Sequence, residues 1–122
     1  MHLNNGDIYQ KVSLLKELIE DKTFYLPAKV NFRLNQNIEL IFNQVKKIEE
    51  SRINIISHYG TVKEDGTYSI PIEKITEANK ELDELLALPC SFNLNPIYLS
   101  WLKNIDLPIR YMNAINFMII DD

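Results

Sequence analysis

The stretch between Pro27 and Gly60 constrains the fold most, because it contains no interior Gly or Pro. Eight of its positions recur at alternating spacings of four and three residues: Leu34, Ile38, Ile41, Val45, Ile48, Arg52, Ile55 and Tyr59. This heptad pattern predicts one amphipathic helix over about 27–59, with Pro27 in its first turn and Gly60 as its C-cap. Such a helix would be roughly 45 Å long, longer than a compact domain of this size is wide. We therefore expect it to pack against the chain's other helices or a second copy, and we predict a homo-oligomer, a dimer or tetramer.

The remaining elements predict a mainly α fold in a single helical domain, 1–122. An N-terminal helix capped by Asn5 should end near residues 21–22. Residues 61–71 contain the turn sequence Glu64-Asp65-Gly66 and predict a small antiparallel hairpin, followed by a helix over about 72–88. Residues 91–95 alternate polar with apolar side chains and predict a strand, which could join the hairpin in a three-stranded sheet. Short helices over about 97–105 and 107–119 should close the chain.

Composition excludes several classes of function. The formal net charge of −4 and the presence of only three arginines argue against general nucleic-acid binding, which needs clustered cations. The single cysteine, Cys90, excludes an internal disulfide and a multi-cysteine zinc site. There is no apolar run long enough for a membrane span and no signal-peptide pattern, so we expect a soluble protein of the cytoplasm without membrane contact.

Arg52 is the most informative single residue, because it occupies a heptad position where an aliphatic side chain is expected. Burial of a guanidinium is costly unless a carboxylate or an anion faces it. One interpretation is a structural partner, either Glu49 or, with better reach, a carboxylate on another helix. The other is a site for a phosphate or carboxylate ligand. In both cases we expect Arg52→Met to fold.

Three further residues complete the candidate ligand-binding set. Arg33 has Phe32 and Tyr25 nearby in sequence, and this combination could stack on a base or pair with a phosphate. Arg110 forms a similar pair with its neighbour Tyr111, and Tyr59 lies at the end of the long helix. For each arginine the alternative is a solvated side chain. We interpret Trp101 and Phe117 as core residues.

No catalytic or metal site is predicted. His58 has no second histidine nearby, and the acidic pairs lie beside lysines on polar helix faces. Phosphate-loop, dinucleotide, nucleophile-elbow and metalloprotease patterns are absent from the sequence. We therefore expect a protein that is not an enzyme and that uses no cofactor.

Several separated stretches, taken in order, resemble a family of small proteins encoded by tailed phages and prophages of low-GC, Gram-positive and gut bacteria. The stretches are 26–30 (LPAKV), 50–52 (ESR), 58–60 (HYG), 64–66 (EDG), 79–82 (NKEL), 84–86 (ELL), 107–108 (LP), 112–114 (MNA) and 117–119 (FMI). The resemblance implies a phage origin and a mostly helical fold. It implies no activity and no site residues, and Ser91-Phe92-Asn93-Leu94 departs from the more acidic strand expected there.

These observations lead to three functional hypotheses. The first is a non-enzymatic phage counter-defence protein in the host cytoplasm. It could be an oligomeric sponge that sequesters a nucleotide immune signal in pockets lined by Arg33, Arg52, Tyr59 and Arg110. It could also inhibit a host defence protein directly, as anti-CRISPR proteins do. The second is a structural or assembly accessory role in the phage, and the third is an enzyme.

Overall fold

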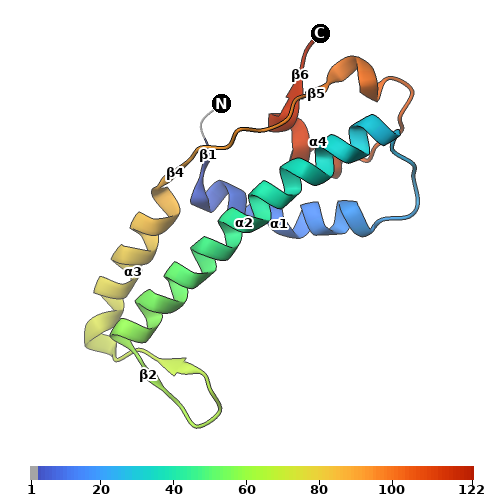
Figure 1. The fold of residues 1–122 in the computed structure, drawn as a ribbon. Coiled ribbons are helices and arrows are strands. Elements are labelled where there is room, and N and C mark those ends of the chain that lie inside the picture. The colour runs from blue at the N-terminus through green and yellow to red at the C-terminus, as the bar shows by residue number, and fades with distance from the viewer. Residues whose placement is uncertain (1–2) are drawn as a thin grey trace.

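One long helix runs the length of the molecule in the computed structural model, which describes residues 3–122 (Figure 1). The described residues form four α-helices: α1 (Asn5–Glu20), α2 (Ala28–Tyr59), α3 (Ile72–Ala87) and α4 (Ile109–Ile115). Short strand pairs account for the β structure. The prediction of a mainly α fold around one central helix is confirmed.

The ends of α2 follow from local sequence. Pro27 is the N-cap, since its missing N–H costs nothing at a helix start. At the other end the Gly60 N–H donates to the Ile56 carbonyl at 2.8 Å, and the chain then turns extended. The helix has 32 residues and no break, so the predicted range of 27–59 differs by one residue.

Helix α1 begins one residue earlier than predicted. Asn4, not Asn5, is the N-cap: its side-chain oxygen accepts from the Asp7 N–H at 2.8 Å, and the Asp7 carboxylate accepts from the Asn4 N–H at 2.9 Å. This reciprocal pair is a capping box. Asn5 is instead buried inside the first turn, where its side-chain amide donates to the Leu85 carbonyl at 2.9 Å and fixes α1 against α3.

The core lies where α1, the first half of α2, the segment after residue 96 and α4 meet. The fully buried side chains of this core are apolar apart from Asn37 and include Ile8, Leu15, Val30, Leu34, Ile41, Ile97, Tyr111, Ile115 and Met118. Heptad positions in the first half of α2 therefore face the core as predicted.

The second half of α2 and the antiparallel helix α3 form an arm that extends away from this core (Figure 1). The hairpin of β2 (Thr61–Val62) and β3 (Tyr68–Ser69) connects them at its tip, with Gly66 at a φ of 86° in the turn. Ala78 is the buried residue of α3, whereas Ile75, which the spacing of apolar residues over 72–88 places on a core face, is exposed. We use "the arm" below for residues 50–87.

The predicted strand at 91–95 is wrong. The neighbouring β4 (Pro89–Cys90) pairs instead with β1 (Leu3–Asn4), antiparallel, and residues 91–96 are extended without a strand partner. No strand joins the hairpin, so within residues 3–122 the three-stranded sheet is absent and the hairpin alternative holds. At the end of this segment, the backbone of Asn95 and Pro96 bonds to the α2 side chains of Asn37 and Arg33 instead.

The C-terminal region is less helical than predicted. Residues 97–105 form β5 (Ile97–Tyr98) and the short 3₁₀ helix η1 (Leu99–Leu102). After α4 the chain continues as the 3₁₀ turn η2 (Asn116–Met118) and β6 (Ile119–Ile120), which pairs with β5 in parallel. The paired residues are isoleucines and one tyrosine, Tyr98, and both residue types favour strands over a continued helix. None of the helices within residues 3–122 is both long and apolar enough to cross a membrane.

Candidate functional site

Arg33 lies in the second turn of α2 and reaches across to the segment that precedes η1. Its guanidinium donates to the Pro96 carbonyl at 2.7 Å. The guanidinium carbon lies 4.9 Å from the centre of the Trp101 ring and 6.0 Å from the centre of the Tyr98 ring. Both distances are within the range of cation–π attraction, so Arg33 is held by two aromatic rings and one carbonyl.

Lys29 adds a second cation to the same indole ring. It precedes Arg33 by one helical turn, so both side chains project from the same side of α2. Its Nζ lies 4.8 Å from the Trp101 ring centre. Tyr98 and Trp101 pack edge to face at 5.0 Å, and their three-residue spacing aligns them where the chain enters η1. We call Lys29, Arg33, Tyr98 and Trp101 the cation–aromatic cluster.

The α2 part of this cluster lies in a positively charged segment, whereas its Tyr98–Trp101 part flanks Ser100, which binds the Asp122 carboxylate. Residues 22–38 contain two lysines, one arginine and no acidic residue. Residues 61–87 contain seven acidic residues and three lysines, a net charge of −4 that equals the formal net charge of the whole chain. The cluster also lies at the positive end of the α2 dipole, whose first turn carries no acid. An anion would therefore be attracted to the start of α2.

Exposed aromatic side chains lie beside the cluster in sequence. Phe32 is 65% exposed and follows Lys29 by three residues, so the two side chains are neighbours on the helix surface. Tyr25 is exposed in the connection between α1 and α2. The start of α2 thus offers cations for a phosphate and free aromatic rings for a base.

Arg52 lies about 28 Å along α2 from Arg33, at 1.5 Å per residue. Of the two structural partners considered, the one found is Glu49, at 3.2 Å and one turn away on the same helix, and not a carboxylate on another helix. Glu49 also accepts from the Tyr9 hydroxyl of α1, and this hydrogen bond is the main cause that lowers the pKa of Glu49. The Arg52 side chain is 43% exposed, so the expected burial is wrong, although a carboxylate does face it.

Tyr59 lies half-buried at the C-terminal end of α2, beside the acidic residues of α3. A hydrogen bond with Glu81, with smaller contributions from burial and from the charges of Glu81, Glu77 and Glu84, raises the pKa of Tyr59. This negative surrounding opposes the binding of an anion at Tyr59.

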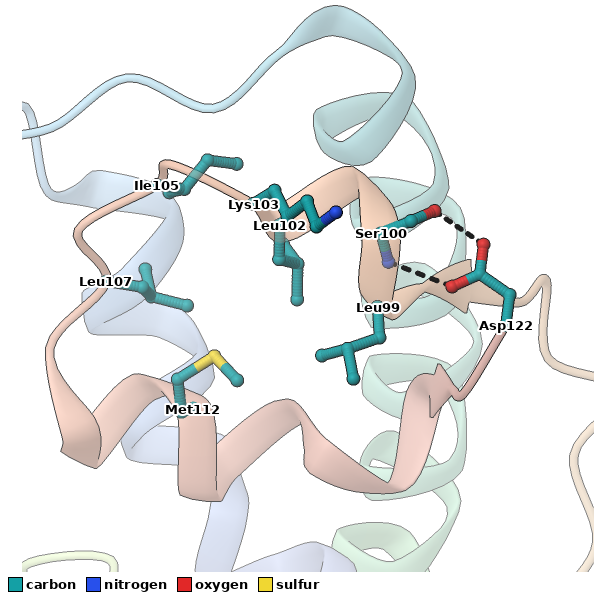
Figure 2. A pocket seen from close by; sticks show the side chains of 8 residues that line it. All are labelled: Leu99, Ser100, Leu102, Lys103, Ile105, Leu107, Met112 and Asp122. Carbon is teal, nitrogen blue, oxygen red and sulfur yellow. Dashed lines mark hydrogen bonds between the residues drawn. The ribbon is translucent and has the colours of Figure 1, made fainter.

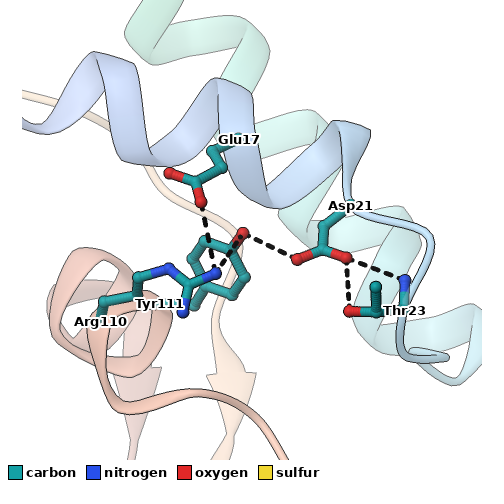
Figure 3. Close-up of polar contacts among 5 residues, drawn as sticks. All are labelled: Glu17, Asp21, Thr23, Arg110 and Tyr111. Atoms are coloured by element: carbon teal, nitrogen blue, oxygen red, sulfur yellow. Dashed lines mark hydrogen bonds and ion pairs between the residues drawn. The ribbon is translucent and has the colours of Figure 1, made fainter.

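Arg110 joins α4 to the end of α1 through a polar network (Figure 3). Its guanidinium contacts Glu17 at 3.3 Å and the Tyr111 hydroxyl at 3.2 Å. That hydroxyl donates to Asp21 at 2.8 Å, and Asp21 also accepts from the hydroxyl and N–H of Thr23. Carboxylates thus already pair with Arg110, and the network ties two helices together.

The structure therefore does not bring the four predicted residues into one site within a single chain. Arg52 and Arg110 each have a carboxylate partner, and Tyr59 lies among glutamates. Of the four, Arg33 lies in a segment without acidic residues, 22–38, which favours an anion. The sequence argument missed Lys29, Tyr98 and Trp101, although the four-residue spacing of Lys29 and Arg33 was a usable signal. Trp101 is half-buried in the cluster and packs only partly against the predicted core.

Other chemistries have little support in the described part of the chain. Residues 3–122 contain no group of three or more His, Cys, Asp or Glu side chains placed to hold a metal ion. The Cys90 thiol donates to the Asn5 side-chain oxygen at 2.9 Å, and burial is the main cause that raises its pKa. A raised pKa disfavours the reactive thiolate.

Comparisons with protein-family profiles, with curated proteins and with solved structures find no match to this chain. The resemblance to phage proteins therefore stays a prediction, and the candidate site depends on its geometry alone.

Proposed function

We propose that this protein is a non-enzymatic binding protein that captures a phosphate-bearing nucleotide at the cation–aromatic cluster. One observation carries the proposal: two cations, Lys29 and Arg33, are held within 5 Å of one indole ring in a segment without acidic residues. Cations placed beside aromatic rings match the two halves of a nucleotide, its charged phosphate and its flat base.

Each residue of the cluster has a distinct role in this proposal. The Lys29 ammonium and the free N–H groups of Arg33 bind phosphate oxygens, helped by the positive end of α2. The Phe32 ring, adjacent to Lys29 on the helix and largely exposed, offers a stacking surface for the base. Trp101 and Tyr98 position the cations, because their faces are already occupied by Lys29 and Arg33.

Together with the resemblance to phage proteins, this binding role supports a sponge that sequesters a host nucleotide immune signal in the host cytoplasm. A sponge needs affinity for its ligand and does not have to react with it, and the cations and aromatic rings of the cluster supply the groups that such binding uses.

We further propose that the protein works as a homo-oligomer through the arm. Ile53 on α2 and Ile72 and Ile75 on α3 are exposed there, with Ile72 at 86%. Isoleucines exposed on the arm are candidates for an interface with a second copy. Light scattering of the wild-type protein should give a mass above the 14.3 kDa of one chain. The double variant Ile53→Asp, Ile75→Asp should have the mass of a monomer. A monomer at high micromolar concentration would contradict this.

Calorimetric titration with a panel of linear and cyclic nucleotides tests the binding proposal. Wild-type protein should bind at least one member, and the double variant Lys29→Met, Arg33→Met should lose that binding. Lys74→Met, Lys80→Met is the matched control, because it removes the same charge from the arm. Equal binding by both double variants, or no binding of any nucleotide by wild type, would refute the proposal.

A second candidate function has one specific observation in its favour. The arm combines exposed apolar residues with the whole net negative charge of the chain, as expected of an inhibitor that imitates nucleic acid on a host defence protein. In an infection assay this alternative predicts that Glu77→Lys, Glu81→Lys abolishes the biological effect. The double variant of Lys29 and Arg33 would then retain the effect.

A further inference from the structure

An apolar pocket opens on the other side of η1 from the cation–aromatic cluster. It has a volume of about 470 Å³, within the range of small-molecule sites, and lies between η1, the loop after it and α4 (Figure 2). Five apolar side chains form its wall: Leu99, Leu102, Ile105, Leu107 and Met112.

The local backbone explains why these side chains surround a space and do not fill it. In the 3₁₀ geometry of η1, Leu99 and Leu102 share one face while Tyr98 and Trp101 share another. Asn104 then adopts a left-handed φ of 67°, where asparagine is tolerated better than most residues. The chain turns there, and Ile105 and Leu107 remain half-buried along the rim of the pocket.

The polar groups of the pocket differ in whether they already have partners. The N–H and hydroxyl of Ser100 both donate to the Asp122 carboxylate, and these bonds are the main causes that lower the pKa of Asp122. Lys103 forms no ion pair with any residue of the described chain 3–122. The pocket therefore presents one available cation beside an apolar wall.

We propose that this pocket binds an alkyl carboxylate, with its head group on Lys103 and its chain along Leu102, Leu107 and Met112. The single available ammonium matches a single negative charge. The ionised Asp122 carboxylate, whose pKa the Lys103 charge also lowers, repels every anionic head group, and it repels a doubly charged phosphate ester more strongly than a carboxylate. This ligand differs in class from the nucleotide proposed for the cluster, and the two sites can be tested separately.

Residue-resolved NMR of the ¹⁵N-labelled chain tests the proposal, with hexanoate, octanoate and decanoate as probes below their micelle concentrations. Saturable shifts should be confined to residues 99–107 and the region of Met112. Each methylene that enters the pocket should lower Kd by about fourfold. Octyltrimethylammonium, which has the opposite charge, should bind far more weakly than octanoate.

Two variants and one control test whether Lys103 binds the head group and whether the apolar wall binds the alkyl chain. Lys103→Met should weaken octanoate by about fivefold, the upper range for an exposed ion pair. Leu99→Asp places a charge at an exposed position on the wall and should abolish binding. Lys74→Met, on α3, should leave Kd unchanged. If Leu99→Asp fails to fold, the octanoate Kd of Lys103→Met alone tests the proposal.

Three results would overturn the proposal: no saturable shifts with any carboxylate, shifts spread over the arm, or an octanoate Kd that Lys103→Met does not change.

Discussion

Asn37 allows the sharpest test of how the candidate site is held in place. It is the fully buried polar residue of α2, at 0% exposure. Its side-chain amide donates to the Asn95 carbonyl at 2.8 Å, and its side-chain oxygen accepts from the Asn95 N–H at 2.7 Å. One side chain thus gives Asn95 the two backbone hydrogen bonds that a strand partner would supply. Arg33, one turn earlier, binds the next carbonyl, that of Pro96.

The perturbation is Asn37→Leu, which keeps the number and branching of the side-chain heavy atoms and removes both hydrogen bonds. The two backbone groups of Asn95 then lose their partners, at about 1–3 kcal/mol each. Asn95 is half-buried, so water reaches it in part and the lower half of that range applies. Burial of the leucine offsets about 1 kcal/mol. We therefore expect the free energy of unfolding to fall by about 2 kcal/mol.

Urea denaturation followed by far-UV circular dichroism measures this loss. With a slope of about 2 kcal/mol per molar urea, the midpoint should fall by about 1 M. Asn35→Leu is the matched control: it makes the same substitution two residues earlier at an exposed position and should change stability by less than about 0.5 kcal/mol. If the two variants have equal midpoints, the inferred role of Asn37 is refuted.

Three shorter predictions concern other residues. Arg52→Met should fold and change stability by less than about 1 kcal/mol, because its bond to Glu49 is partly exposed; urea denaturation checks this. Hydrogen bonds from Thr23, and to a smaller extent from Tyr111, lower the pKa of Asp21 in the folded protein. The Asp21 carboxylate therefore stabilises the fold at pH values above its pKa in the unfolded chain. This stabilisation is lost as the pH falls through its pKa in the folded protein. Asp21→Asn should therefore be less stable than wild type at neutral pH, with the difference shrinking in acid. Cys90 should react slowly with a thiol reagent at neutral pH, and rapid labelling of the folded protein would contradict its raised pKa.

Local signals made the long helix predictable. A proline start, a glycine stop and an unbroken heptad pattern act within a few residues of each boundary. The same pattern failed to report burial beyond about residue 50, because a heptad position is buried only where a neighbour covers it. Helix α1 lies beside the middle of α2 and does not extend to the tip of the arm (Figure 1), so the heptad positions Arg52, Ile55 and Tyr59 remain partly exposed.

The error at residues 91–95 has a specific physical reason. The alternation of polar and apolar residues correctly predicted side-chain burial, since Phe92 and Leu94 contact the core while Ser91 and Asn93 are exposed. Alternation does not say where the backbone hydrogen bonds go. Those of Asn95 go to the side chain of Asn37, 58 residues away in sequence, and a period of two carries no information about such a partner.

The cation–aromatic cluster could be predicted only in part, because its two halves are distant in the chain. Lys29 and Arg33 are visible as a pair on one helix face, but Trp101 follows them by about 70 residues, and the contact depends on the extended 91–96 segment. That segment is fixed to α2 by Asn37 and Arg33, so the cations are held in place before any ligand arrives. Preorganised groups lose little entropy on binding, and this favours affinity. Asn37→Leu should therefore weaken nucleotide binding as well as stability, although Asn37 lies outside the cluster. Weakened binding measured in urea-free buffer, where the variant remains folded, would distinguish a positioning role for the segment from simple unfolding.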